Sequence, residues 1–180
     1  SLPRYGRGMA DLLDLSSAII DEQRLDVPVN RVTNELSEVA DGLAVVESFS
    51  HSVVVNTGEG LIAFDSSGGA TGAAVVEAIR RWSPAPVRHL VYTHGHADHV
   101  GGSGHFAAAF GRPEVTGHRR VLDRLDRYAV TSDWNRLINA RQFGGTRGEL
   151  GLGLDNGAAR GSDFQAFLPA DTLRPDRIVD

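Results

Sequence analysis

The residues with the clearest chemical potential form one short stretch, YTHGHADHVGGSGH, at positions 92–105. Four of the seven histidines of the chain lie in it. In an extended segment, residues two apart point the same way, so His94 and His96 can present two imidazoles to one metal ion. Asp98 and His99 follow as the chain turns, where they can face a second position close by. The stretch therefore predicts a metal site.

The chemistry of such a site is limited by the absence of cysteine from the chain. All ligands must be nitrogen or oxygen atoms, which suits zinc, iron or manganese, and the spacing does not choose among them. Two metals roughly 3.5–4 Å apart lower the pKa of a bridging water and polarise the oxygen of the bond it attacks. A pair of metal ions with a bridging water favours hydrolysis of an ester, amide, thioester, sulfate or phosphate bond.

The segments around the motif predict an alternation of short strands and helices. Three runs rich in Val, Ile and Phe, at residues 42–49, 52–58 and 61–67, are separated by turn residues and indicate an antiparallel meander. The other expected elements are a helix over 71–82, a strand over 87–93, a helix from about 99 to 110, a short strand over 114–116 and helical structure over 118–142. The histidine motif thus follows a buried strand.

Composition divides the chain into three expected parts. Residues 1–38 are predicted to be an N-terminal arm with one or two helical turns around 11–20. Residues 39–143 hold the strands, the motif and the following helices. Residues 144–180 combine a loop with seven glycines between Gly144 and Gly161 and the opening of a strand at Ile178-Val179.

The string from Thr93 to Gly102 resembles the H-x-H-x-D-H signature of the metallo-β-lactamase superfamily. The preceding strands, and Asp65 at the end of the third run, are similar to the N-terminal half of that family over about residues 40–120. The resemblance implies an α+β fold, the αββα sandwich, with a dinuclear metal centre at one edge of its sheets. It further implies that these 180 residues hold only the N-terminal half of the sandwich.

The resemblance also implies roles for individual residues. Carried over by position, His94 and His96 bind the first metal, and Asp98 and His99 bind the second. Asp65 is then a residue that braces the ligands from behind. Within the superfamily, THGHADHVGG followed by RYAVTSDWNRLINARQFGG is similar to the branch that contains alkyl sulfatases.

One part of the family pattern is missing. The family needs a third histidine for the first metal, a bridging aspartate and a last histidine for the second metal, all well downstream. No histidine follows His118, and His105 and His118 lie too close to the motif to take these roles. We therefore expect a longer hydrolase cut where its second sheet should begin, so that the missing half or a homo-oligomer supplies ligands and covers apolar sheet surface. The alternative is a degenerate relative that binds metal weakly or not at all.

Several further residues are weaker candidates for substrate contact. His51 lies in a hairpin turn that in this fold can border the active site. Residues 112–147 hold eight arginines and four acids, and Arg136 or Arg141 can grip an anionic group. The plainer interpretation is a solvated helix with Arg119–Asp123 and Asp123–Arg127 pairs at four-residue spacing. His89, His105 and His118 are expected to be structural.

Charge and hydropathy limit the partners and the compartment. A net charge of −5 and a pI near 5.8 give no reason to expect nucleic acid. No apolar run approaches the length of a membrane span, and Asp11 and Asp14 interrupt the only apolar stretch near the start, which makes it a poor secretory signal. We expect a cytoplasmic protein that acts on a small molecule.

The leading hypothesis is a hydrolase with two divalent metal ions, zinc being the first expectation, acting on an ester, sulfate ester, lactone or thioester. Asp98 would hold the second metal and orient the nucleophile or accept its proton. Two alternatives stay open. The chain can be a non-catalytic assembly module of the same fold, or a di-iron redox enzyme that works with a flavin protein.

Overall fold

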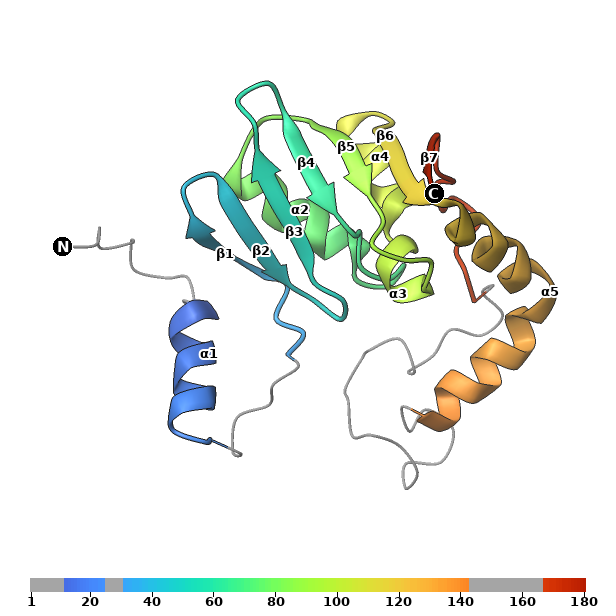
Figure 1. Cartoon of the computed structure of the whole chain (residues 1–180), viewed down its shortest axis with the longest axis horizontal. Coiled ribbons are helices and arrows are strands. Elements are labelled where there is room, and N and C mark those ends of the chain that lie inside the picture. The colour runs from blue at the N-terminus through green and yellow to red at the C-terminus, as the bar shows by residue number, and fades with distance from the viewer. Residues whose placement is uncertain (1–11, 25–30, 143–166) are drawn as a thin grey trace.

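A single mixed sheet organises the molecule. The computed structural model describes residues 12–24, 31–142 and 167–180. In the described residues, seven strands follow one another across the sheet in sequence order. They are β1 (Glu35–Ala40), β2 (Leu43–Glu47), β3 (Ser52–Asn56), β4 (Leu61–Phe64), β5 (Val87–Val91), β6 (Glu114–His118) and β7 (Arg177–Val179). The first four pair in antiparallel fashion, and β4 to β7 pair in parallel (Figure 1).

The change from antiparallel to parallel pairing comes from the connections. Short turns join β1 to β4, whereas α2 (Gly72–Trp82) carries the chain from β4 back to the start of β5. The helices α3 (Ala97–Val100) and α4 (Ser103–Phe110) connect β5 to β6. As a result β4 and β5 end side by side, and the residues that follow them meet at one edge of the sheet.

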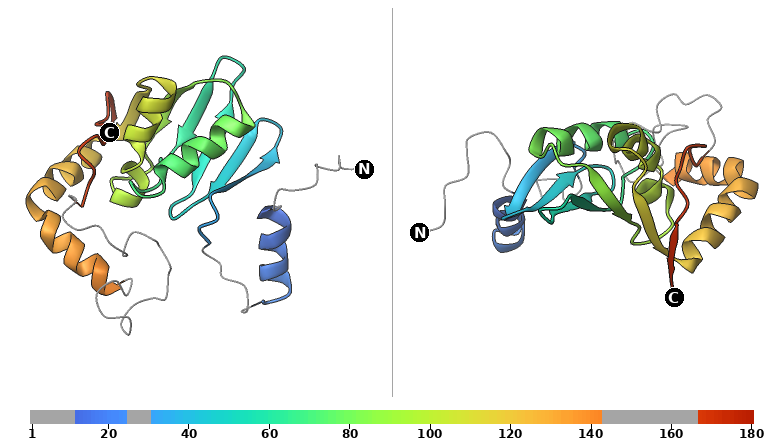
Figure 2. Two further views of the ribbon diagram at one scale, coloured as in Figure 1. Left: turned by 180° about the vertical axis from the view of Figure 1, so that it is seen from behind. Right: turned by 90° about the horizontal axis from the view of Figure 1, so that it is seen from above.

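The core lies between the sheet and the helices on one of its faces. Both α2 and α4 cover this face and contact each other (Figure 2). The alternation along β2 and β3 places Ala44, Val46 and Val54 in the core, fully buried. The alternate residues Val45, Val53 and Val55 point to the opposite face and are only partly buried. The sheet therefore carries apolar side chains on both faces.

Two outer helices flank the sheet. The helix α1 (Leu12–Asp21) lies beside β1, and α5 (Arg119–Gln142) follows β6 at the far side (Figure 1). The backbone of α5 leaves helical geometry at Thr131, whose hydroxyl donates to the carbonyl of Arg127 at 2.8 Å. Among the described residues, no helix combines the length and hydropathy that crossing a lipid bilayer requires.

Most elements expected from the sequence are present, with three differences. The strand at Glu35–Ala40 begins inside residues 1–38, where the sequence indicated an arm. The strand at Ile178-Val179 is present, but it joins β6 in the first sheet and does not begin a second one. Arg119 pairs with Asp180 and not with Asp123, because β7 brings Asp180 alongside the start of α5. The glycine-rich segment at 144–161 lies outside the described residues.

Candidate metal centre

Asp65 is the centre of the site that forms where β4 and β5 end. It directly follows β4, is 5% exposed, and has a backbone φ of 60°, in the left-handed region that Asp tolerates better than most residues. Its Oδ1 accepts from the backbone N–H of Thr93 at 2.8 Å, and its Oδ2 accepts from the Thr93 hydroxyl at 2.6 Å. The carboxylate therefore ties the end of β4 to the residue that opens the histidine motif.

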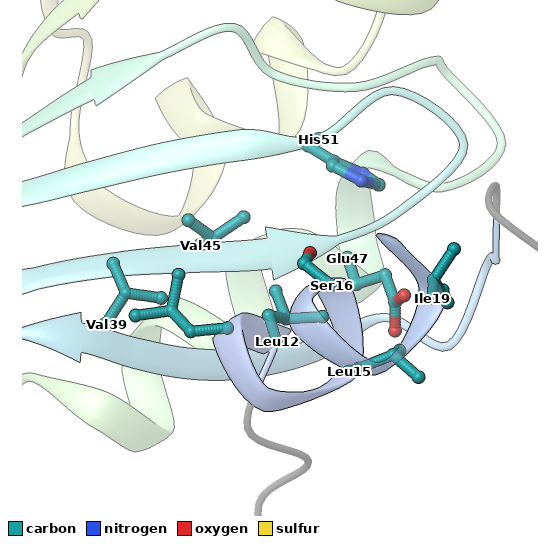
Figure 3. A pocket seen from close by; sticks show the side chains of 9 residues that line it. Leu12, Leu15, Ser16, Ile19, Val39, Val45, Glu47 and His51 are labelled. Atoms are coloured by element: carbon teal, nitrogen blue, oxygen red, sulfur yellow. The ribbon is translucent and has the colours of Figure 1, made fainter. Parts of the chain in front are cut away.

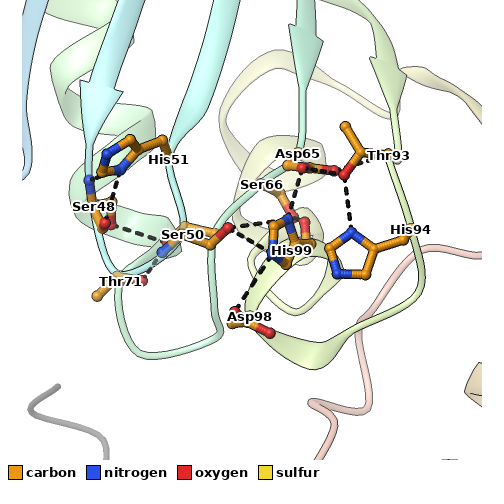
Figure 4. A network of polar contacts seen from close by, with 11 residues as sticks. Ser48, Ser50, His51, Asp65, Ser66, Thr71, Thr93, His94, Asp98 and His99 are labelled. Carbon is orange, nitrogen blue, oxygen red and sulfur yellow. Dashed lines mark hydrogen bonds and ion pairs between the residues drawn. The ribbon is translucent and has the colours of Figure 1, made fainter. Parts of the chain in front are cut away.

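The same carboxylate holds His99. The Nδ1 of His99 lies 2.7 Å from Oδ2 of Asp65, so this nitrogen carries the proton and donates it (Figure 4). Because Nδ1 carries the proton, Nε2 keeps its lone pair for a metal, which is the usual arrangement for a histidine ligand backed by a carboxylate. Burial opposes protonation of His99, but the hydrogen bond and the negative charge of Asp65 outweigh it and raise the pKa of His99.

His94 faces His99 across the site. Their ring centroids are 3.9 Å apart, and the ring of His96 lies 4.5 Å from that of His94. Burial, followed by the neighbouring His99 and His96, lowers the pKa of His94. A neutral imidazole is the form that binds metal, so the surroundings of His94 favour ligation.

The structure gathers a set of possible donor atoms at this edge. Side-chain atoms of Asp65, His94 and His99 lie within 4.8 Å of one another. Asp98 approaches the set through its Oδ2, which is 3.5 Å from Nε2 of His99. His96 lies beside His94 and is exposed. Imidazole and carboxylate donors at these separations fit a zinc, iron or manganese ion.

The turn that carries the ligands depends on close backbone contact with the end of β4. The N–H of Ser66 donates to the carbonyl of His99 at 2.7 Å, and the N–H of Gly102 donates to the carbonyl of Ser67 at 3.0 Å. A Cβ atom at position 102 would lie 2.0 Å from the carbonyl oxygen of Ser66. Only glycine allows this approach, which explains the need for a small residue after the ligands.

Serine side chains from the β2–β3 loop complete the surroundings, and sequence reasoning missed them. The hydroxyl of Ser50 lies 3.0 Å from Nδ1 and 3.1 Å from Nε2 of His99. The hydroxyl of Ser48 lies 3.0 Å from that of Ser67, which in turn lies 2.7 Å from that of Thr71 (Figure 4). Serine is common in turns, so nothing in the sequence marks these residues as neighbours of a metal site.

The weaker candidates for substrate contact lie outside the cluster of Asp65, His94 and His99. His51 is in the same loop as Ser50, but its Nδ1 is next to the backbone of Ser48, 3.1 Å from the carbonyl oxygen. Arg136 approaches Asp133 of its own helix at 3.7 Å. Arg141 is exposed in the last turn of α5.

The three histidines expected to be structural make contacts outside the cluster. His105 donates from Nε2 to the carbonyl of Gly69 at 3.2 Å, and Nδ1 of His118 accepts from the N–H of Arg120 at 3.1 Å. His89 lies on β5 with Nδ1 at 3.9 Å from a carboxylate oxygen of Glu114.

Comparison with known proteins agrees with the motif. The sequence model of the Metallo-beta-lactamase superfamily matches residues 45–162, more than half of the chain. No curated protein sequence matches the chain. The fold and the family match together show that the chain belongs to the metallo-β-lactamase superfamily.

Solved structures of the family resemble only part of the chain. A metallo-β-lactamase with a HARLDQ motif from Cronobacter sakazakii is 20% identical over 54% of this chain and 36% of its own, with a TM-score of 0.48. A double mutant of the sec-alkyl sulfatase PisA1 is 20% identical over 62% of this chain and 19% of its own, with a TM-score of 0.54. The chain thus spans about a third of the first protein and a fifth of the second.

Proposed function

We propose that this protein is a metal-dependent hydrolase with a dinuclear centre at the edge where β4 and β5 end. The observation that carries the proposal is the cluster of Asp65, His94 and His99, because it brings two imidazoles together beside a buried carboxylate that holds one of them. When bound, divalent ions supply Lewis acidity that activates a water and polarises the bond to be cleaved. Zinc is the metal that we propose first, and the nitrogen and oxygen donors also suit iron and manganese.

Each residue of the proposed centre is assigned either to one of the two metals or to bracing a ligand. His94 and His96 are assigned to the first metal by the resemblance to the family motif, and their ring centroids lie 4.5 Å apart. Asp98 and His99 are assigned to the second, since their side chains approach at 3.5 Å. Asp65 is assigned to bracing, because three donors already occupy its two oxygens. Asp98 is half exposed, so it is the carboxylate that can orient the attacking water or accept its proton.

The proposal includes further ligands from outside residues 1–180. No histidine follows His118, so the third histidine of the first metal, the bridging aspartate and the last histidine of the second metal would come from another segment or another subunit. The partly buried valines on the open face of the sheet favour the same partner, because covering them would remove apolar surface from water. A small molecule, with an anionic group near Arg136 or Arg141, is the substrate class that we propose.

Metal content and ester hydrolysis test the proposal together. The full-length protein should hold two zinc ions by plasma mass spectrometry and hydrolyse at least one of a panel of 4-nitrophenyl esters, sulfate esters, lactones and thioesters. The double variant His94→Ala/His96→Ala should lose one ion and the activity. The matched control His89→Ala removes an exposed imidazole from β5 and should change neither. Full metal content in the double variant would contradict the assignment, and a metal-loaded protein inactive on the whole panel would favour an assembly module.

A further inference from the structure

Residues 167–176, which we call the C-terminal strap, lie against the ligand motif without contributing a ligand. The strap packs on α4, on α5 and on the turn after β4. It differs in this from the pocket of about 280 Å³ between α1 and the strands β1 and β2, which is on the open face of the sheet that we expect a partner segment to cover (Figure 3). The contacts of the strap with the motif are formed within the described residues.

One residue of the strap, Leu173, bonds to both ends of the ligand motif. Its carbonyl oxygen accepts from the hydroxyl of Tyr92 at 2.9 Å, and its N–H donates to the hydroxyl oxygen of Ser103 at 2.9 Å. Tyr92 is 3% exposed and Ser103 is fully buried, so both bonds are shielded from water. Burial raises the pKa of Tyr92, which keeps the phenol protonated as a donor. Residues 81 and 70 positions apart are joined in this way.

These two bonds reach the proposed ligands through one further contact each. Tyr92 directly precedes Thr93, whose N–H and hydroxyl donate to the buried carboxylate at the centre of the site. The hydroxyl of Ser103 donates to the carbonyl of Val100 at 2.7 Å. Val100 directly follows His99, so a shift of this carbonyl would displace the imidazole before it.

Glycines let the strap approach the segments around the motif closely. A Cβ atom at Gly69, in the turn after β4, would lie 2.5 Å from Cγ of Pro169. A Cβ atom at Gly104, in the first turn of α4, would lie 2.0 Å from Oδ2 of Asp171. Packing this tight transmits a displacement and does not absorb it.

The strap is anchored to the rest of the fold at other points. Asp176 accepts from the N–H of Val115 on β6 at 3.0 Å, and Arg174 donates to Asp126 of α5 at 2.9 Å. The side chain of Leu168 packs against the core. The strap is therefore a fixed frame, and the motif is the part that is positioned against it.

We propose that Tyr92 and Ser103 are positioning residues of the metal centre, which act through the backbone of Leu173. They hold the two ends of the motif against the strap, so that its imidazoles need little rearrangement to bind ions. The inference rests on the proposed function, because it takes the residues of the motif as the metal ligands.

Two hydroxyl deletions test the inference in the full-length protein. Tyr92→Phe and Ser103→Ala should each raise the dissociation constant for zinc about three- to ten-fold, measured by competition with a chromophoric chelator. The matched controls should stay within about two-fold of the wild type. Tyr128→Phe removes the hydroxyl of a buried tyrosine that bonds within α5. Ser83→Ala removes the hydroxyl of a buried serine at the end of α2, which like that of Ser103 accepts from a backbone N–H.

A spectroscopic measurement on the zinc-free protein separates positioning from overall stability. The Nδ1 proton of His99 is donated to Asp65 at 2.7 Å, and its exchange with water reports how firmly the ring is held against the carboxylate. Nitrogen-15 NMR should show this proton exchanging at least about three-fold faster in Tyr92→Phe and Ser103→Ala, and at the wild-type rate in both controls. A purely structural role would leave the rate unchanged well below the unfolding midpoint.

The outcomes also separate this inference from the proposed function. Unchanged zinc affinity and exchange in Tyr92→Phe and Ser103→Ala, or equal changes in the controls, overturn the inference whatever the effect on the free energy of unfolding. A wild type that hydrolyses no substrate, while these variants lose zinc affinity, supports the inference and removes only the hydrolytic function. A wild type that binds no zinc overturns both. Far-UV circular dichroism confirms folding, and should Tyr92→Phe unfold, Ser103→Ala with its control Ser83→Ala decides the test.

Discussion

Two buried carboxylates lie at the same end of the sheet, and they are neutralised in different ways. Glu47 ends β2 and Asp65 follows β4, and since β3 runs antiparallel between them both strands end at this edge. Each is 5% exposed. Glu47 is gripped by a guanidinium, whereas the partners of Asp65 are a backbone N–H, a hydroxyl and an imidazole.

We interpret this difference as one between a structural charge, that of Glu47, and a charge that serves the proposed site, that of Asp65. A buried carboxylate needs a cation or several donors to offset its lost hydration. Glu47 has a cation, Arg31, and further donors, so the negative charge of Glu47 is balanced by Arg31. Asp65 directs its charge at His99, a side chain that can bind a metal. Asp65 is therefore the candidate site residue of the two, because its partner His99 is itself a possible metal ligand.

The largest effect should come from breaking the turn that brings Asp65 and His99 together. Gly102→Ala places a methyl group 2.0 Å from the carbonyl oxygen of Ser66, and neither backbone can retreat without losing hydrogen bonds. We expect a loss of more than about 3 kcal/mol in the free energy of unfolding, measured by urea denaturation. Gly68→Ala is the matched control, because its Cβ would meet no atom closer than 3.7 Å. Equal destabilisation by both changes would show that the packing at position 102 is not the constraint.

The next effect concerns metal affinity. Asp65→Asn keeps the shape but removes the charge, and its one acceptor oxygen can replace Oδ1 or Oδ2 but not both, so its NH2 group must face either the Thr93 N–H or the Thr93 hydroxyl and His99. We expect the dissociation constant for zinc to rise about 10- to 100-fold, measured by competition with a chromophoric chelator. The comparison variant is Glu47→Gln, which removes the other buried charge and should leave zinc affinity unchanged. A similar loss in both variants would end the distinction between the two acids.

The contribution of Glu47 should instead appear in the pH dependence of the free energy of unfolding. Burial alone would raise its pKa, but the hydrogen bonds from Arg31 and Thr33 reverse this and lower the pKa below its ordinary value of 4.5. Its contribution to stability is therefore fully present above pH 4.5 and is lost as the pH falls through the lowered pKa. We expect Glu47→Gln to cost about 1–3 kcal/mol at pH 7 and progressively less in acid. Urea denaturation from pH 7 to pH 3 measures this, and a difference that stays constant down to pH 3 contradicts it.

The sequence predicted one of these carboxylates and not the other, for physical reasons. Asp65 was visible because it ends an apolar run just before a glycine-rich turn. The partner of Glu47 is sixteen residues away in sequence, in a segment without periodicity, so only the folded chain reveals the pair. The strand β1 was missed for a related reason, since ELSEVA carries two acids and a bulge that breaks the alternation.

The grouping of the candidate ligands was predictable because they are close together in the sequence, whereas the groups that contact them were not. His94, His96, Asp98 and His99 follow one strand, and two-residue spacing with a turn places them without knowledge of the rest of the fold. Ser50 reaches His99 from a loop 49 residues earlier. Such contacts depend on the register of β2, β3 and β4, which periodicity alone does not fix.

The smallest expected effect tests whether charge or loop position orients His99. Ser50→Ala removes a neutral hydroxyl that lies 3.0 Å from Nδ1 and 3.1 Å from Nε2 of His99, and leaves the contact of Asp65 with Nδ1 in place. We expect zinc affinity to fall about two- to ten-fold, the range of a single neutral hydrogen bond. Ser48→Ala is the control, because Ser48 bonds to Asn34 and Ser67 and should alter stability without altering zinc affinity. If Ser50→Ala instead lowers zinc affinity as much as Asp65→Asn does, the β2–β3 loop positions His99 and the carboxylate of Asp65 does not. Asp65 and Glu47 would then differ only in their partners.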